Sequence, residues 1–106
     1  MAALAAAAVA ANSSRPATAI AHDAPDARLV VFRIGAGQTV TPHVSPSSVV
    51  LVVAAGAGFV LGDEGERAVG AGDVISFEPN ERHGMRAEAQ ELVVLAVITP
   101  RPGARS

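Results

Sequence analysis

The chain has 106 residues, of which half are apolar and 17% are charged, and its formal net charge is −2. This length fits one domain with a modest core, and the composition excludes a disordered chain, which would combine low hydrophobicity with high net charge. The basic residues are all arginines, spread from Arg15 to Arg105, and the only aromatic residues are three phenylalanines. Since nucleic-acid binding needs a concentrated positive face and usually stacking aromatics, we discount nucleic acid as a partner.

The sequence contains no cysteine, which excludes disulfides, thiolate metal sites and cysteine nucleophiles. No apolar run reaches the ~20 residues that are needed to cross a bilayer. The alanine-rich start lacks the basic segment of a signal peptide. We therefore expect a soluble, cytoplasmic protein that has no membrane partner.

Residues 1–16 are predicted to form an N-terminal arm. Residues Ala2–Ala11 have high helix propensity and contain no Gly or Pro, so a short helix is expected that ends before Pro16. From residue 17 onward, β-branched runs alternate with clusters of Gly, Pro, Asp and Asn. This pattern predicts an all-β sandwich or barrel domain at residues 17–106.

Short strands are predicted throughout this domain, with tight turns between them. The glycine-rich segments 62–65 and 70–73 supply residues with positive φ for two of these turns. Segments this short leave no room for the long crossovers of parallel strands, so antiparallel pairing is expected. The predicted strands lie at residues 17–21, 28–34, 38–40, 49–54, 58–61, 66–69, 74–77, 84–87 and 92–99.

The run Val49–Val53 is apolar at every position, whereas a strand with one solvated face should alternate. One face of this strand is expected to fill the interior. The other could be covered by the N-terminal arm, by a second sheet or by a second copy of the chain. We expect a homodimer, because an uncovered apolar sheet face is an association site.

Two segments resemble the paired metal-binding motifs of the cupin superfamily. In that family the first motif is Gly-x5-His-x-His-x3-Glu-x6-Gly and the second is Gly-x5-Pro-x-Gly-x2-His-x3-Asn. Here the first segment reads GQTVTPHVSPSSVVLVVAAG and the second reads GDVISFEPNERHGMRA. The positions that match are Gly37, His43, Gly56, Gly72 and His83, and residues 57–71 separate the two segments, as in short cupins.

The resemblance implies a small antiparallel β-barrel of the RmlC-like type, a double-stranded β-helix or cupin jelly roll, with a short N-terminal helical arm. Asn80 stands where the family usually has Gly and is the next best residue for a left-handed conformation. The family's second His is Ser45 here, its Glu is Val49 and its terminal Asn is Ala87. Only two of the family's four ligating positions therefore keep a metal ligand.

The resemblance implies that His43 and His83 point into the barrel from neighbouring strands. A catalytic zinc usually has three protein ligands, and an iron oxygenase needs two His and one carboxylate. We therefore expect either no cofactor or a weakly held divalent ion, such as Zn, Ni, Fe or Mn, on these two residues. A replacement ligand could come from Gln38, Ser45, Glu78 or Glu81.

The most favoured function is the binding of a small molecule inside the barrel near the two histidines. The expected pocket residues are His43, Ser45, Val49, His83 and Met85. The alternative is a metal-dependent cupin enzyme, of the oxygenase or isomerase type, that uses the two histidines as metal ligands. No catalytic residue is assigned, because a metal-free epimerase would pair a His base with an aromatic acid and the chain has no Tyr.

Overall fold

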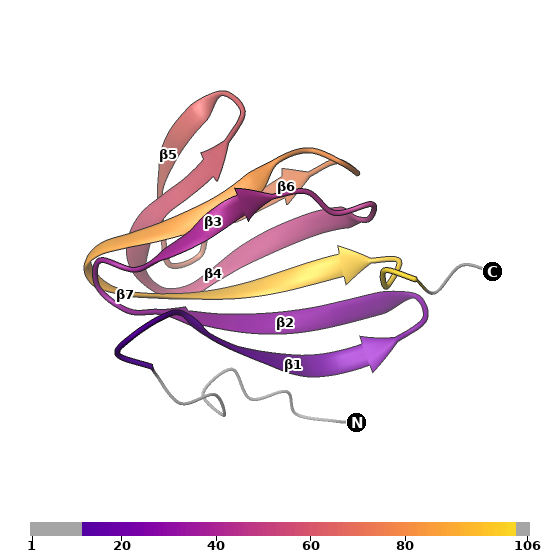
Figure 1. Cartoon of the computed structure of the whole chain (residues 1–106), viewed down its shortest axis with the longest axis horizontal. Coiled ribbons are helices and arrows are strands. Elements are labelled where there is room, and N and C mark those ends of the chain that lie inside the picture. The colour runs from indigo at the N-terminus through magenta and orange to yellow at the C-terminus, as the bar shows by residue number, and fades with distance from the viewer. Residues whose placement is uncertain (1–11, 104–106) are drawn as a thin grey trace.

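The computed structural model describes residues 12–103, and within that range the protein consists of strands and turns alone (Figure 1). The helix predicted for Ala2–Ala11 lies outside the described residues. The strands are β1 (Ala17–Ala24), β2 (Ala27–Ile34), β3 (Thr39–His43), β4 (Ser48–Gly62), β5 (Gly65–Gly70), β6 (Val74–Phe77) and β7 (His83–Thr99).

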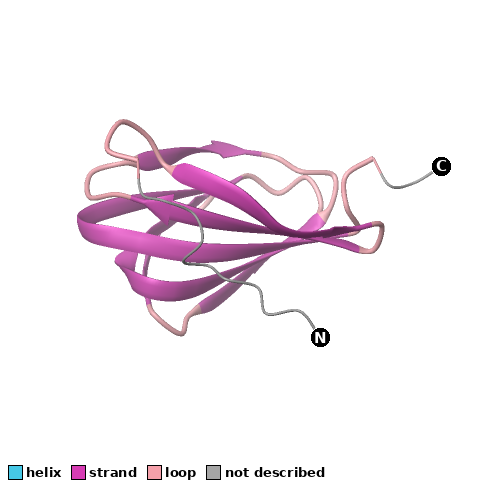
Figure 2. Ribbon diagram, turned by 90° about the horizontal axis from the view of Figure 1, so that it is seen from below, coloured by secondary structure: helices cyan, strands magenta, loops and turns pink. Residues whose placement is uncertain are grey.

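Two long antiparallel strands, β4 and β7, organise the whole sheet. They pair from Ser48 with Thr99 at one end to Gly62 with His83 at the other. At residues 53–58 the register of the pair shifts twice, and there the sheet folds over. Figure 2 shows the strands curling around a common interior. All the pairings are antiparallel, so the predicted antiparallel all-β barrel is confirmed.

The fold-over divides the sheet into two layers. The first layer contains β1, β2, β6, residues 48–56 of β4 and residues 92–99 of β7. The second layer contains β3, β5, residues 57–62 of β4 and residues 83–87 of β7. Each layer therefore has two edge strands of its own and shares its two central strands with the other.

The breaks between strands that the sequence predicts at residues 55–57 and 88–91 are wrong, because β4 and β7 continue through these residues. Gly56 explains how a strand bends there without a turn. It has a φ of +80°, and a Cβ at this position would lie 1.8 Å from the carbonyl oxygen of Glu91. Only glycine allows the two bent strands to approach this closely.

The core lies between the layers and is aliphatic. In the first layer, alternate residues of β4 and β7 face inward and are at most 3% exposed: Val49, Leu51, Val53, Leu92, Val94 and Ala96. Burial of each larger side chain stabilises the fold by ~1.5–3 kcal/mol as an upper estimate, since the unfolded chain already buries part of this surface.

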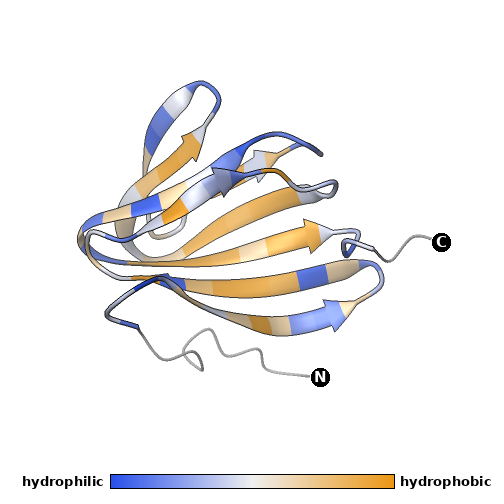
Figure 3. Ribbon diagram, in the orientation of Figure 1, coloured by the Kyte–Doolittle hydropathy of each residue, from blue (hydrophilic) through white to orange (hydrophobic). Residues whose placement is uncertain are grey.

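The outer face of the first layer is apolar as well. Val50 and Val52 of β4 pair with Val97 and Leu95 of β7, and all four are half-buried. Figure 3 shows hydrophobic colour along β2, β4 and the C-terminal part of β7. This part of β4 is therefore apolar on both faces, as predicted, while the homodimer stays a prediction. Residues 12–103 include no helix of the length and hydropathy that crossing a membrane requires.

Candidate functional site

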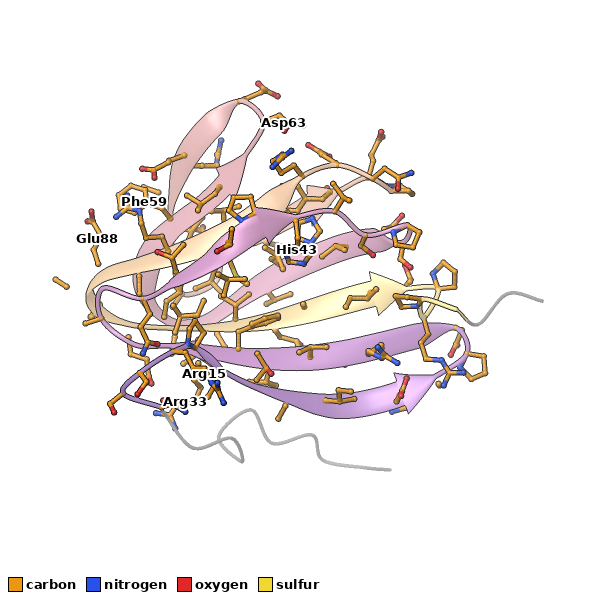
Figure 4. The ribbon with its side chains drawn as sticks, viewed as in Figure 1. Arg15, Arg33, His43, Phe59, Asp63 and Glu88 are labelled. Atoms are coloured by element: carbon orange, nitrogen blue, oxygen red, sulfur yellow. The ribbon has the colours of Figure 1, made fainter. Side chains whose placement is uncertain are left out.

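The structure brings the two motif histidines together. His43 is the last residue of β3, His83 is the first residue of β7, and their Cα atoms are register partners. Their ring centroids lie 4.4 Å apart, with the ring planes at 57°. In Figure 4, His43 lies at the end of β3, on the side of β4. The expected approach of the two imidazoles is therefore confirmed.

Local sequence explains this approach. The register of β3 against β7 shifts between Val40 and His43, and Pro42 at this shift has no N–H to donate to the sheet. Next to His83, a Cβ on Gly84 would lie 2.7 Å from the carbonyl oxygen of Val40 and 2.9 Å from the nitrogen of Pro42. Glycine at this position lets β3 lie against β7, which places one ring beside the other.

Each ring is held by a backbone carbonyl. The Nδ1 atom of His83 lies 2.9 Å from the carbonyl oxygen of Glu81, and that of His43 lies 3.2 Å from the carbonyl oxygen of Thr41. A carbonyl only accepts, so we assign the proton of each neutral ring to Nδ1. Each Nε2 then keeps its lone pair, as in histidines that bind a metal or accept a hydrogen bond from a ligand.

His83 is 5% exposed, and its environment favours the neutral ring. Burial lowers the pKa of His83 below its ordinary value of 6.5, and the charge that His43 can carry lowers it further, against the opposing effect of the Glu81 carbonyl. Phe77 packs on the same imidazole, with ring centroids 5.2 Å apart. His83 is therefore suited to accepting a hydrogen bond near neutral pH.

The other three expected pocket residues have structural roles. Val49 and Met85 are 2% and 1% exposed and belong to the apolar core. The hydroxyl of Ser45 accepts from the backbone N–H of Ser47 at 3.2 Å, and its carbonyl accepts from the N–H of Asn80 at 2.7 Å. That these three residues border a ligand stays a prediction.

Asn80 has a φ of +65°, so its expected left-handed conformation is confirmed. Its hydrogen bond to Ser45 ties the β6–β7 loop to the β3–β4 loop, directly beside the histidine pair.

The described residues supply only two good metal donors at this site. Within residues 12–103, no group of three or more His, Asp or Glu side chains is placed to hold a metal ion. The amide of Gln38 is bonded to Gly35 and Asn12 at the β2–β3 turn. The carboxylate of Glu81 accepts from the N–H of Glu78 at 2.9 Å. Water or a ligand would have to complete any coordination shell, so this donor set does not fit a tightly held catalytic metal.

A cavity of about 360 Å³ lies near the histidine pair, but neither histidine lines it. It lies between the β4–β5 hairpin, β6 and the β6–β7 loop, and its lining includes Val60, Gly62, Arg67, Ile75, Phe77 and Glu81. Phe77 contacts the ring of His83, and Gly62 is the register partner of His83. These two lining residues therefore connect the cavity to the histidine pair. The sequence-based pocket contains none of these residues, because the hairpin that forms the wall is placed by long-range pairing.

Two arginines that flank His83 in the sequence are held elsewhere. Arg86 packs over the ring of Phe59 at 4.4 Å and binds both carboxylate oxygens of Glu66, at 3.2 and 2.7 Å. It also binds Glu88 at 2.8 Å, and these carboxylates raise its pKa further above its usual range. Arg82 pairs with Asp63 at 3.5 Å. Neither guanidinium lines the cavity.

Comparisons with known proteins agree with this architecture. A family model described as a cupin domain matches residues 30–99. An RmlC-like cupin from Desulfovibrio desulfuricans is 27% identical, with a TM-score of 0.81 over 88% of this chain and 90% of that chain. A comparison with curated proteins found no match.

Two enzymes share the fold at lower identity. The polyketide cyclase RemF from Streptomyces resistomycificus is 20% identical, with a TM-score of 0.81 over 97% of this chain and 82% of that chain. The DMSP lyase DddQ from Ruegeria pomeroyi is 17% identical, with a TM-score of 0.75 over 91% of this chain and 54% of that chain. The family match covers most of the barrel, both histidines included, and the chain therefore belongs to the cupin domain family.

Proposed function

We propose that this cupin domain binds a small organic molecule beside His43 and His83 and needs no tightly held metal to do so. The observation that carries the proposal is the pair of imidazoles at 4.4 Å, each with Nδ1 on a backbone carbonyl. Two Nε2 acceptors, near a cavity of about 360 Å³ whose lining residue Phe77 contacts His83, suit an organic ligand with hydrogen-bond donors.

The second candidate is a metal-dependent enzyme, and the same two Nε2 atoms favour it. RemF and DddQ are a cyclase and a lyase on this fold, but at their identity they support the fold alone. With two protein donors, a divalent ion would bind through His43 and His83 and hold water in its other positions. We derive no reaction step through such an ion.

Elemental analysis separates the two candidates when the protein is purified without a metal-affinity tag or a chelator. We expect far less than one equivalent of Zn, Ni, Fe or Mn per chain. A metal at one equivalent that is lost in His43→Ala but kept in His22→Ala would favour the enzyme. His22 is a matched control because it is exposed on β1 and lies outside the pair.

Native mass spectrometry of the same samples tests for a ligand directly. We expect a co-purified organic mass, or a rise in the thermal midpoint with an added one, in the wild type and in His22→Ala but not in His43→Ala. Binding that is unchanged in His43→Ala would contradict the proposed site.

A further inference from the structure

The β4–β5 hairpin places one solvent-exposed arginine beside the cavity. Arg67 on β5 is the register partner of Val60 on β4, and Val60 is the partner of Met85 on β7. Residues directly opposite one another in antiparallel strands share a face of the sheet. Since Val60 and Met85 are core residues, Arg67 lies on the inner face, where it lines the cavity.

The guanidinium of Arg67 has no partner among residues 12–103: it makes no hydrogen bond, ion pair or ring contact there. Two other arginines, one in the β6–β7 loop and one on β7, differ in this respect. Arg82 is paired with Asp63, and Arg86 is paired with Glu66. Arg67 is therefore the one cavity-lining cation of the described chain whose donors are all free.

Four carboxylates also line the cavity, and most of them are already engaged. Asp63 and Glu66 are bound by the arginines named above. Glu81 accepts from a backbone N–H, and Glu64 lies in the exposed turn of the hairpin. Glu64 and Glu81 are the two lining carboxylates that no arginine among residues 12–103 binds, so they compete with an anionic ligand for the guanidinium of Arg67.

Apart from Ser76 and two glycines, the rest of the cavity wall is apolar. Val60 and Phe77 are 4% and 6% exposed, and Ile75 packs against the core. Gly62 has no side chain to fill the space between Arg67 and the histidine pair. A Cβ there would lie 3.8 Å from the Cε1 atom of Phe77, which is ordinary contact.

We propose that Arg67 binds the carboxylate of a small organic acid, whose apolar body lies on Val60, Ile75 and Phe77. Arginine offers a planar fork of donors that matches a carboxylate. From strand spacing and rise, the Cα atoms of Arg67 and His83 lie ~12 Å apart, so a ligand of modest size bridges the two groups. This inference rests on the proposed ligand-binding function and names the chemical class of the ligand.

Benzoate is the probe, because it combines one carboxylate with a flat apolar body. Benzamide is its neutral counterpart and benzylamine carries the opposite charge. Chemical-shift titration of the intact protein measures the weak dissociation constants expected for ligands of this size. We expect benzoate to bind at least ~10-fold more tightly than benzamide, and benzylamine to bind more weakly than both.

The variants assign the effect to one side chain. Arg67→Gln is expected to weaken benzoate binding at least ~10-fold while leaving benzamide binding unchanged. Arg15→Gln is the matched control, because Arg15 is exposed near β2 and far from the β4–β5 hairpin (Figure 4), and it should bind like the wild type. Glu64→Gln should bind benzoate more tightly, and Gly62→Val should weaken all three probes by filling the cavity.

Equal binding of benzoate and benzamide, preference for benzylamine, or no binding of any probe would overturn the inference. The variant His43→Ala distinguishes a failure of this inference from a failure of the proposed function. If benzoate binding is lost in His43→Ala but unchanged in Arg67→Gln, the histidine site stands and the role of Arg67 is wrong. The amide spectrum of each variant reports whether it is folded.

Discussion

The two layers of the barrel share their central strands but differ in what those strands carry. In the first layer, β4 and β7 are apolar on both faces, and Leu51, Leu92 and Val94 are at most 1% exposed. In the second layer, the outer face carries the Arg86–Glu66 ion pair, and the inner face carries the histidine pair. The first layer supplies most of the fully buried aliphatic side chains, whereas the second adds Val60, Val69 and Met85 to the same core and also positions polar groups.

The difference teaches that core and site can occupy different stretches of one strand. His83 begins β7 and Leu92 lies beyond its bend, yet both face the same interior. A site residue is therefore held in position by core residues that lie further along its own strand. Changes in the core of the first layer should alter stability strongly, and changes to the polar side chains of the second layer should alter it weakly.

The largest expected effect is a loss of stability in the first layer. Leu92→Ala removes a side chain that is 0% exposed, and we expect the free energy of unfolding to fall by about 3 kcal/mol because a cavity remains. Leu95→Ala is the matched control on the half-buried outer face and should cost about 1 kcal/mol. Urea unfolding measures both, and equal losses would show that the outer face is buried, as in the predicted homodimer.

A smaller effect is expected from the pH dependence of stability, through His83. Its pKa is lowered in the fold, so the unfolded chain binds a proton more readily. This contribution to stability is present above the unfolded-state pKa of about 6.5 and is lost as the pH falls through that value, at no more than ~1.4 kcal/mol per pH unit.

Urea unfolding between pH 7.5 and 5.5 tests this expectation. His83→Gln should flatten the profile, whereas His22→Gln, which changes an exposed ring on β1, should keep its slope. A wild-type stability that increases toward pH 5.5 would contradict the assigned sign.

The smallest effect is expected on the outer face of the second layer. Arg86→Gln removes the ion pairs with Glu66 and Glu88 and the contact with Phe59, so we expect Tm to fall by about 2 °C at low salt and by less at high salt. Arg82→Gln, whose pair with Asp63 is longer and more exposed, should leave Tm unchanged. Calorimetry at two salt concentrations measures these Tm values. Equal changes in Tm for the two variants would contradict the expectation.

The sequence predicts the barrel because glycine spacing and turn chemistry are local signals. The expected left-handed Asn80 and the approach of His43 to His83 follow from motif spacing, and the structure confirms both. The continuity of β4 and β7 could not be predicted in this way. Residues near Gly56 have the composition of a turn, and only their pairing with the distant Leu92 keeps them in a strand.

The face of the sheet on which Arg67 lies could not be predicted from the sequence, for a related reason. Glu66 and Arg67 are adjacent charged residues, so alternation alone does not say which of them faces inward. The pairing of Arg67 with Val60 decides it, and that pairing depends on where the hairpin turns. Register, more than composition, therefore separates the Arg86–Glu66 ion pair on the outer face from the exposed guanidinium of Arg67 that lines the cavity.

The two shared strands also determine how the molecule opens. Because β4 and β7 are hydrogen-bonded in both layers, their amide protons exchange with solvent only when the whole sheet separates. The edge strands β1 and β5 each pair with one neighbour and can detach on their own. Local opening of β5 is therefore expected on a faster timescale than global unfolding, without disturbing the strands that hold the rest of the barrel together.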